Sequence, residues 1–153
     1  RSLGLQEPIR SLGFQRVEAL MPQIGLVVLS SISEALPLVL LEGYAAGVPT
    51  VTTDAGSCRQ LVEGLDDEDR ALGHSGTVVP IADPQRLADA ALALLGDPAA
   101  WQAASQAAIA RVERYYTDTL MFARYRKVYE TALERTPQAP QAPHAPGGPA
   151  WQA

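Results

Sequence analysis

The sequence is poor in cysteine, in aromatic residues and in positive charge, and each shortage excludes a class of protein. Cys58 is the single cysteine among 153 residues, which excludes an internal disulfide framework and a cysteine-built zinc site. The reduced cytoplasm is therefore the expected compartment. Only 6% of the residues are aromatic, so aliphatic side chains must build the core. Twelve basic against 17 acidic residues give a net charge of −5, which argues against a general nucleic-acid-binding protein.

Long apolar runs and a leader are lacking as well. No run approaches the roughly 20 apolar residues that a membrane-spanning helix needs. The chain opens with Arg1 and no charged-then-apolar leader follows, so we expect no signal peptide and expect a piece of a longer protein. The sequence is nevertheless 47% hydrophobic and 19% charged, a balance typical of a chain that folds around a core.

The last 18 residues differ from the rest. Residues 136–153 read TPQAPQAPHAPGGPAWQA, with five prolines and no Asp, Glu, Lys or Arg. Proline lacks a backbone donor and fixes φ, so this composition favours an extended polyproline II conformation over helix or strand. We predict a disordered tail. A ligand for a proline-reading module is the alternative interpretation.

Residues 1–135 alternate between strand and helix signals. Short apolar or β-branched segments predict strands at residues 24–30, 48–53 and 77–80, and a weaker signal predicts an edge strand at residues 9–12. Helix-start signals occur near Val17, Pro37, Gly56, Asp83, Asp97 and Thr117 or Asp118. The acidic segment at residues 65–75 is interpreted as a solvated loop. Strands that alternate with helices predict an α/β fold, with a Rossmann-like parallel sheet covered by helices on both faces.

Two glutamates bracket the helix start that follows the first clear strand. Pro37 suits the first turn of that helix, and the amides of Leu38 and Val39 are left without partners inside it. Such amides, assisted by the helix dipole, bind anions. Glu42 can accept hydrogen bonds from the vicinal hydroxyls of a ribose, and Glu34, in the preceding loop, from a second polyol. A nucleotide sugar carries all three features.

Spacing alone leaves other interpretations open. Two glutamates eight residues apart also fit a solvated Glu42 and a Glu34 that merely complements the helix dipole. Arg59, at the next helix start, could offer positive charge to a diphosphate or could be an ordinary surface arginine. Cys58 is interpreted as a packing residue, because nothing nearby in the sequence would activate it.

A family resemblance favours the nucleotide-sugar interpretation. Residues 28–62, VLSSISEALPLVLLEGYAAGVPTVTTDAGSCRQLV, resemble the donor-binding segment of glycosyltransferase family 4, with its Glu-x7-Glu motif. The matching elements include Glu34, the Pro37-Leu38 pair, Glu42 and the Val48-Pro49 pair. The run from Asp54 through SCRQL resembles one branch in particular, the Pel-polysaccharide glycosyltransferases (PelF). The resemblance covers nearly all of residues 5–130.

The resemblance implies a GT-B fold, in which two Rossmann-like domains face each other across a cleft. Residues 1–135 would be most of the C-terminal, donor-binding domain. Glu34 would contact the transferred sugar and be the catalytic residue, Glu42 would hold the ribose, and the backbone of Leu38 and Val39 would meet the diphosphate. Ser31 and Ser33 would line the sugar pocket.

The resemblance also implies a reaction and its partners. Such enzymes transfer a hexosyl unit with retention of configuration and without a bound metal, and a UDP-linked donor is expected. The acceptor would be a growing polysaccharide or another glycan. The enzyme would be cytoplasmic, peripheral to the inner membrane through a polysaccharide synthase complex. The family's acceptor domain and its cationic phosphate contacts, an Arg and a Lys, would precede Arg1, so we expect this chain alone to bind donor weakly and to be inactive.

Two other functions remain compatible with the sequence. One is a non-catalytic, glycosyltransferase-like subunit that scaffolds a membrane synthase complex, which the proline tail would suit. The other is a GT-B nucleotide-sugar epimerase, which needs no acceptor.

Overall fold

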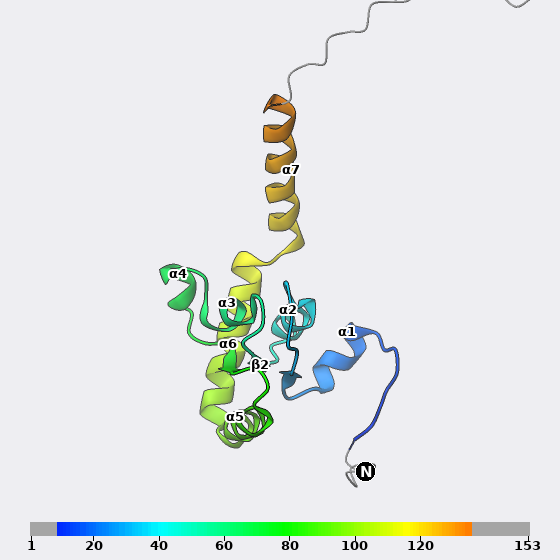
Figure 1. Cartoon of the computed structure of the whole chain (residues 1–153), viewed down its shortest axis with the longest axis vertical. Coiled ribbons are helices and arrows are strands. Elements are labelled where there is room, and N and C mark those ends of the chain that lie inside the picture. The colour runs from blue at the N-terminus through cyan, green and yellow to red at the C-terminus, as the bar shows by residue number, and fades with distance from the viewer. Residues whose placement is uncertain (1–8, 136–153) are drawn as a thin grey trace, which may run out of the picture. The chain divides into compact units, whose positions relative to one another are not determined.

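The structure is a computed structural model that describes residues 9–135 and divides into two compact units. The first unit ends at Thr117 and contains the sheet. The second begins at Asp118 and contains helix α7 (Asp118–Arg135) (Figure 1). The predicted tail, residues 136–153, lies outside the described residues, so the domain boundary at residue 135 stays a prediction.

Three parallel strands form the sheet of the first unit. They are β1 (Val27–Leu29), β2 (Thr50–Thr53) and β3 (Gly76–Val79), in the order β1-β2-β3. Val27 pairs with Thr50, and Thr50 pairs with Gly76. The three strand predictions and the parallel α/β fold class are confirmed. β1 and β2 are shorter than predicted, and β3 begins and ends one residue earlier. Residues 9–12 form no strand, so the prediction of an edge strand there is wrong.

Each strand is followed by at least one helix, as the alternation of strand and helix signals predicts. The helical elements of the first unit are α1 (Val17–Leu20), the 3-10 turn η1 (Met21–Gln23), α2 (Leu38–Ala45), α3 (Cys58–Glu63), α4 (Asp67–Arg70), α5 (Pro84–Gly96) and α6 (Pro98–Tyr115). The predicted helix starts at Asp83 and Asp97 are confirmed, and both residues are N-caps: Asp83 accepts from the amide of Arg86 at 3.0 Å, and Asp97 accepts from the amides of Ala99 and Ala100. Each carboxylate satisfies donors that the helix leaves unpaired.

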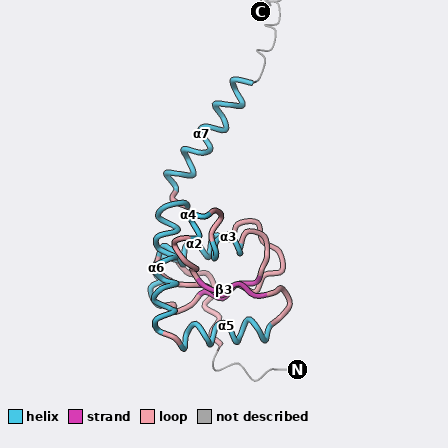
Figure 2. Tube along the Cα trace, turned by 90° about the vertical axis from the view of Figure 1, so that its left-hand side faces the viewer, coloured by secondary structure: helices cyan, strands magenta, loops and turns pink. Residues whose placement is uncertain are grey.

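Side chains pack against both faces of the sheet. On one face α2 and α3 contribute the fully buried Leu40, Tyr44, Cys58 and Leu61 to a single cluster. On the other face Val51 packs with residues of α5 and α6. Figure 2 shows β3 between α5 on one side and α2 and α3 on the other. The packing role predicted for Cys58 is confirmed, and its thiol side chain is completely buried.

Helix α6 crosses the amino-terminal edge of the sheet. Its side chains donate to carbonyl oxygens that shortly precede the three strands: Trp101 Nε1 to Gly25 (2.6 Å), Ser105 Oγ to Gly47 (2.6 Å) and Arg111 Nη2 to Gly73 (2.8 Å). Because all strands are parallel, their carboxyl ends lie together at the opposite edge. The loops that carry the predicted site residues therefore lie away from α6.

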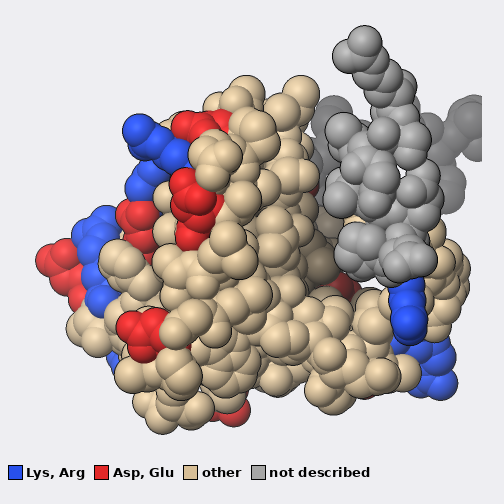
Figure 3. All heavy atoms as spheres, turned by 90° about the horizontal axis from the view of Figure 1, so that it is seen from below, with Lys and Arg blue, Asp and Glu red and all other residues tan. Residues whose placement is uncertain are grey.

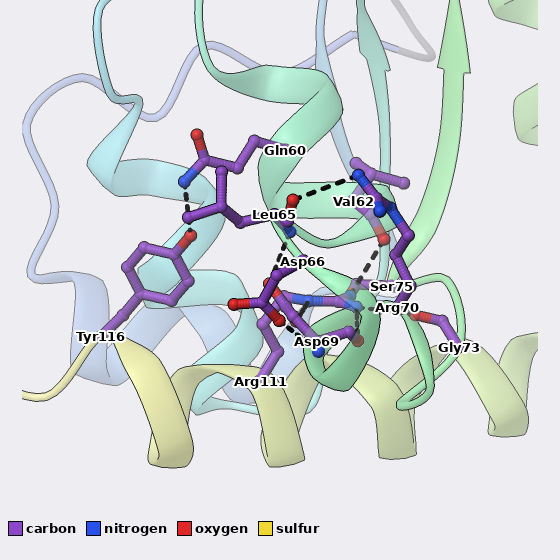
Figure 4. A network of polar contacts seen from close by, with 10 residues as sticks. All are labelled: Gln60, Val62, Leu65, Asp66, Asp69, Arg70, Gly73, Ser75, Arg111 and Tyr116. Atoms are coloured by element: carbon purple, nitrogen blue, oxygen red, sulfur yellow. Dashed lines mark hydrogen bonds and ion pairs between the residues drawn. The ribbon is translucent and has the colours of Figure 1, made fainter.

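A buried ion pair fastens the segment before β3 to α6 (Figure 4). Arg111 is fully buried, and its Nε donates to Asp69 Oδ1 at 2.5 Å. Its other donors bind the hydroxyl of Ser75 and the carbonyl oxygens of Val62, Asp69 and Gly73. The prediction of a solvated loop at residues 65–75 is therefore wrong at Asp69, whose side chain is only 2% exposed.

Helix α7 presents apolar and aromatic side chains to solvent. Met121, Tyr125, Val128 and Tyr129 are all exposed. The rings of Tyr125 and Tyr129 stack with centroids 6.5 Å apart. Across residues 9–135, every helix is either too short or too polar to cross a lipid bilayer.

Candidate functional site

The loop from β1 to α2 and the loop from β2 to α3 meet at the carboxyl edge of the sheet. Residues 30–37 form the first loop and carry Glu34. The second loop ends at Ser57, whose amide donates to the carbonyl oxygen of Ala35 at 3.2 Å. The two connections are thus in direct contact, at the edge where ligands bind in open parallel sheets.

The amino end of α2 carries two donors without an internal acceptor. Pro37 is the N-cap, with φ −74° and ψ 104°, rather than a residue of the first turn as predicted. The amide of Leu40 reaches the carbonyl oxygen of Pro37 at 3.2 Å. In the part of the chain that the structure describes, no group accepts from the amides of Leu38 and Val39. The Leu38 side chain is 63% exposed, so little apolar packing covers this helix start.

Glu42 lies in the wall of a pocket. It follows Leu38 by four residues, so it lies on the same side of α2 and about 6 Å along the helix axis. The pocket has a volume of about 310 Å³, and α1, η1 and the second half of α2 surround it. Its lining residues are Val17, Glu18, Met21, Pro22, Glu42, Ala45 and Ala46. Most of these side chains are apolar, and the two glutamates supply the carboxylates.

Sequence reasoning missed the far wall of this pocket. The short helix near Val17 was predicted, but nothing in the sequence places it beside Glu42. The wall consists of Val17, Met21 and Pro22. Pro22 was the one available signal for this wall, because a proline fixes φ and so indicates the turn η1 that follows α1. It does not indicate that the turn lies beside Glu42.

Glu34 lies in the loop before α2 and does not line the pocket. Glu34 and Ser31 are half-buried, whereas Ser33 is exposed. The structure thus places Glu34 and Glu42 on one loop-and-helix unit, on either side of the helix start. Ser31 and Ser33 lie on the same loop as Glu34.

Arg59 is engaged by two carboxylates. Its Nη2 lies 2.8 Å from Asp54 Oδ2, and its Nη1 lies 2.6 Å from Glu63 Oε1. The hydrogen bond to Asp54 is the main cause that raises the pKa of this guanidinium. The structure therefore favours the interpretation of Arg59 as a surface ion-pairing residue over that of a phosphate ligand.

The charge pattern of the surface agrees with the low basic content. On the face in Figure 3, the Lys and Arg side chains at the left stand beside Asp and Glu side chains, a separate small basic group lies at the right, and no basic patch runs across the face between them. Among residues 9–135, no three His, Cys, Asp or Glu side chains gather in an arrangement suited to a metal ion.

Comparison with known families identifies the chain. Residues 1–97 match the family model described as glycosyl transferases group 1. The chain belongs to this glycosyltransferase family. It is 34% identical over 123 residues to an exopolysaccharide phosphotransferase of Streptomyces coelicolor, and 31% identical over 100 residues to the lipopolysaccharide core biosynthesis mannosyltransferase LpsB of Rhizobium meliloti. These matches cover 79% and 65% of the chain, but only 12% and 27% of the two relatives.

Solved glycosyltransferase structures share the fold. Sucrose-phosphate synthase from Thermosynechococcus elongatus superposes with a TM-score of 0.66 at 23% identity, over 78% of this chain and 29% of that one. HepE from Anabaena, solved in complex with UDP-glucose, gives a TM-score of 0.67 at 24% identity, over 84% of this chain and 34% of that one. The Rossmann-like, GT-B-type fold class is thereby confirmed. Special closeness to the Pel-polysaccharide branch stays a prediction.

Proposed function

We propose that this chain is the donor-binding part of a retaining glycosyltransferase that transfers a hexosyl unit from a UDP-linked sugar to a glycan acceptor. One observation carries the proposal. Helix α2 begins with two amides, those of Leu38 and Val39, that have no hydrogen-bond acceptor within the helix. The same helix places Glu42 in the wall of a pocket. Membership in the glycosyltransferase family gives this arrangement its chemical meaning.

The helix start suits the diphosphate. The amides of Leu38 and Val39 would donate to its oxygens, and the positive end of the helix dipole would favour its negative charge. No acidic residue occupies the first turn of α2, so no side chain of that turn competes for the amides. The overall charge of −5 gives no general attraction for an anion, so local geometry must hold the diphosphate.

The pocket suits the nucleoside. The carboxylate of Glu42 would accept hydrogen bonds from the two ribose hydroxyls. The base would then rest on the apolar side chains of Val17, Met21 and Pro22. A volume of about 310 Å³ lies at the lower end of the range for small-molecule sites, which fits a nucleoside rather than a whole nucleotide sugar.

Glu34 is the residue that we assign to the sugar of the donor. It precedes the helix start, on the side of the diphosphate opposite Glu42, and would contact the hydroxyls of the transferred hexose as the catalytic residue. Ser31 and Ser33 lie on the same loop and would line the sugar site. Retention of configuration and independence of a metal ion follow from the family 4 resemblance.

The relatives support the rest of the proposal. HepE was solved with UDP-glucose, which supports a UDP-linked donor. The names of the two curated relatives concern an exopolysaccharide and a lipopolysaccharide core, which supports a bacterial glycan acceptor. Membership in the Pel-polysaccharide branch rests on the resemblance of the run from Asp54 through SCRQL alone. The acceptor domain, and a synthase complex at the inner membrane, would be the partners of a cytoplasmic enzyme.

Calorimetric titration with UDP and UDP-glucose tests the proposal. We expect weak binding that persists in excess EDTA, because no metal ion is needed to hold the diphosphate. Glu42→Gln should weaken UDP binding about tenfold, since it removes a charged hydrogen-bond acceptor. Glu113→Gln, which changes an exposed glutamate on α6, is the matched control and should leave UDP binding unchanged.

Two results would contradict the proposal. Equal UDP affinity for wild type and Glu42→Gln would show that Glu42 does not hold the ribose. Absence of binding to either ligand would instead favour a non-catalytic, glycosyltransferase-like subunit.

A further inference from the structure

The Glu34 loop is held by the segment that follows β2. Thr53 Oγ1 donates to the carbonyl oxygen of Ser31 and lies 3.4 Å from that of Leu29. Ser57 donates twice to the carbonyl oxygen of Ala35, from its hydroxyl at 2.5 Å and from its amide at 3.2 Å. These bonds fix the loop on both sides of Glu34.

Gly56 provides a third contact. Its φ is +54°, and an added Cβ would lie 1.9 Å from the carbonyl oxygen of Glu34 and 2.6 Å from its carbonyl carbon. Any other residue would therefore have to displace the backbone of Glu34, besides adopting a left-handed conformation that L-residues disfavour. The backbone of Glu34 thus rests directly on Gly56.

The hydroxyl of Ser57 is used in an unusual way. Ser57 is the N-cap of α3, where a serine side chain ordinarily accepts from an amide of the helix that it precedes. This side chain caps no amide of α3 and donates to the carbonyl oxygen of Ala35 instead. The hydrogen bond stabilises the Glu34 loop rather than the helix on which Ser57 stands.

Apolar burial contributes little to holding the same loop. The side chains of Ile32 and Leu36, on either side of Glu34, are 76% and 44% exposed. Polar contacts and backbone packing from residues 53–57 must therefore define its conformation. The orientation of the Glu34 carboxylate therefore depends on the contacts that Thr53, Gly56 and Ser57 make with this loop.

We propose that Thr53, Gly56 and Ser57 are positioning residues that orient Glu34 towards the sugar of the donor. This inference rests on the proposed function, because it takes Glu34 as the sugar contact. None of the three residues needs to touch substrate. They act through the backbone of residues 31–35. The loop after β2 thereby determines the conformation of the loop after β1, which carries Glu34.

A double-mutant cycle combined with amide hydrogen exchange tests the proposal. Ser57→Ala and Thr53→Val, studied in the 153-residue chain without ligand, should speed exchange of the amide of residue 57, which donates to the carbonyl oxygen of Ala35, about fivefold, as expected for one lost hydrogen bond. In the wild-type background Glu34→Gln should weaken UDP-glucose binding. In the Ser57→Ala background the same substitution should have much less effect, because the carboxylate is already misplaced.

Matched variants separate positioning from general stability. Thr50→Val removes a buried hydroxyl bond of 3.0 Å from β2 to the carbonyl oxygen of Val27, and Ser105→Ala removes the bond to Gly47. Both should leave exchange of the Ser57 amide and the effect of Glu34→Gln unchanged. Ser57→Thr and Thr53→Ser keep the hydroxyls and should behave like wild type.

The outcomes distinguish this inference from the proposed function. If Glu34→Gln has no effect on UDP-glucose binding in the wild-type background, the sugar contact is wrong, and the role given to the three residues fails with it. If Glu34→Gln weakens binding equally in both backgrounds, the positioning role alone is overturned, whatever the exchange rate of the amide of residue 57. Gly56→Ala adds a second check, since it should change the amide shifts of Glu34 and Ala35 more than those of other residues.

Discussion

At the residue scale, a buried ion pair joins two charges that the sequence gives no reason to pair. Arg111 and Asp69 are 42 residues apart, and both are buried. Composition favours a solvated acidic loop, because acidic residues surround Asp69 in sequence. The burial arises only when α6 crosses the amino edge of the sheet, which is tertiary information.

We predict that Arg111→Met destabilises the fold by about 3–5 kcal/mol, since it leaves the carboxylate of Asp69 buried without its partner. Arg114→Ala is the matched control on the same helix. Arg114 pairs with Glu68 at 2.7 Å, but both side chains are more than half exposed, so its loss should cost about 0–1 kcal/mol. Urea unfolding monitored by circular dichroism measures both changes. Similar values for the two variants would show that the buried pair does not stabilise the fold.

Tyr44 makes stability depend on pH in the alkaline range. Burial raises the pKa of its phenol above the ordinary value, and the charge of Arg111 opposes this only in part. Above about pH 10 the unfolded chain loses the proton while the folded chain keeps it. The free energy of unfolding should therefore fall as pH rises, by up to about 1.4 kcal/mol per pH unit from this group.

Tyr44→Phe should reduce that alkaline loss. The Tyr44 hydroxyl makes no hydrogen bond to any described residue, so the substitution should change stability little near neutral pH. Tyr125→Phe, at an exposed position of α7, should keep the wild-type pH dependence. Urea unfolding at about pH 8 and about pH 10.5 compares the variants. An unchanged alkaline loss in Tyr44→Phe would refute this origin.

At the element scale, α2 makes the clearest link between local sequence and function. Its helical signal, the glycine after its end and the proline before its start are all visible in the sequence. Gly47 has φ +72° just past the C-cap Ala46, as the pattern predicts. The helix begins one residue later than predicted, because Pro37 has an extended ψ and is the N-cap rather than the first helical residue. Boundaries of this kind shift by a residue when tertiary contacts fix the chain entering the helix.

The donors at the start of α2 can be removed singly. Proline is tolerated at the first position of a helix, where its missing amide has no helical partner in any case. The extended ψ of Pro37 is compatible with a following proline. We predict that Leu38→Pro keeps the fold but weakens UDP binding about tenfold, through loss of one charge-assisted hydrogen bond.

Leu38→Ala is the control for that substitution. It removes a largely exposed side chain but keeps the amide, so it should bind UDP as wild type does. Calorimetry gives the affinities, and circular dichroism checks that Leu38→Pro is folded. Equal affinity for Leu38→Pro and Leu38→Ala would exclude the amide as a phosphate ligand.

At the scale of the whole molecule, the two edges of the sheet have different roles. Helix α6 binds the amino edge through side chains placed along its length. The carboxyl edge carries Glu34, the start of α2 and the loop that supports them. The alternation of strands and helices and the parallel sheet were readable from the sequence, whereas the order of the strands comes from the structure. The route of α6, and the place of α1 beside Glu42, were not readable from the sequence, because each depends on contacts between distant segments.

The part of the site predicted from sequence is the part that is local in sequence. Glu34, Leu38, Val39 and Glu42 fall within nine residues, so one loop and one helix place them. The pocket wall at Met21 and the supports after β2 come from other segments. The chain also covers only 12% and 27% of the length of its curated relatives.

An NMR titration of the 15N-labelled chain with UDP tests the central claim most directly. That claim is that the start of α2 and Glu42 together hold a nucleoside diphosphate. The account predicts that the amide signals of Leu38 and Val39 move most, with a dissociation constant of about 1 mM or below, and that Glu42→Gln weakens the titration while Glu113→Gln does not. Shifts confined to other residues, or none in the millimolar range, would contradict it.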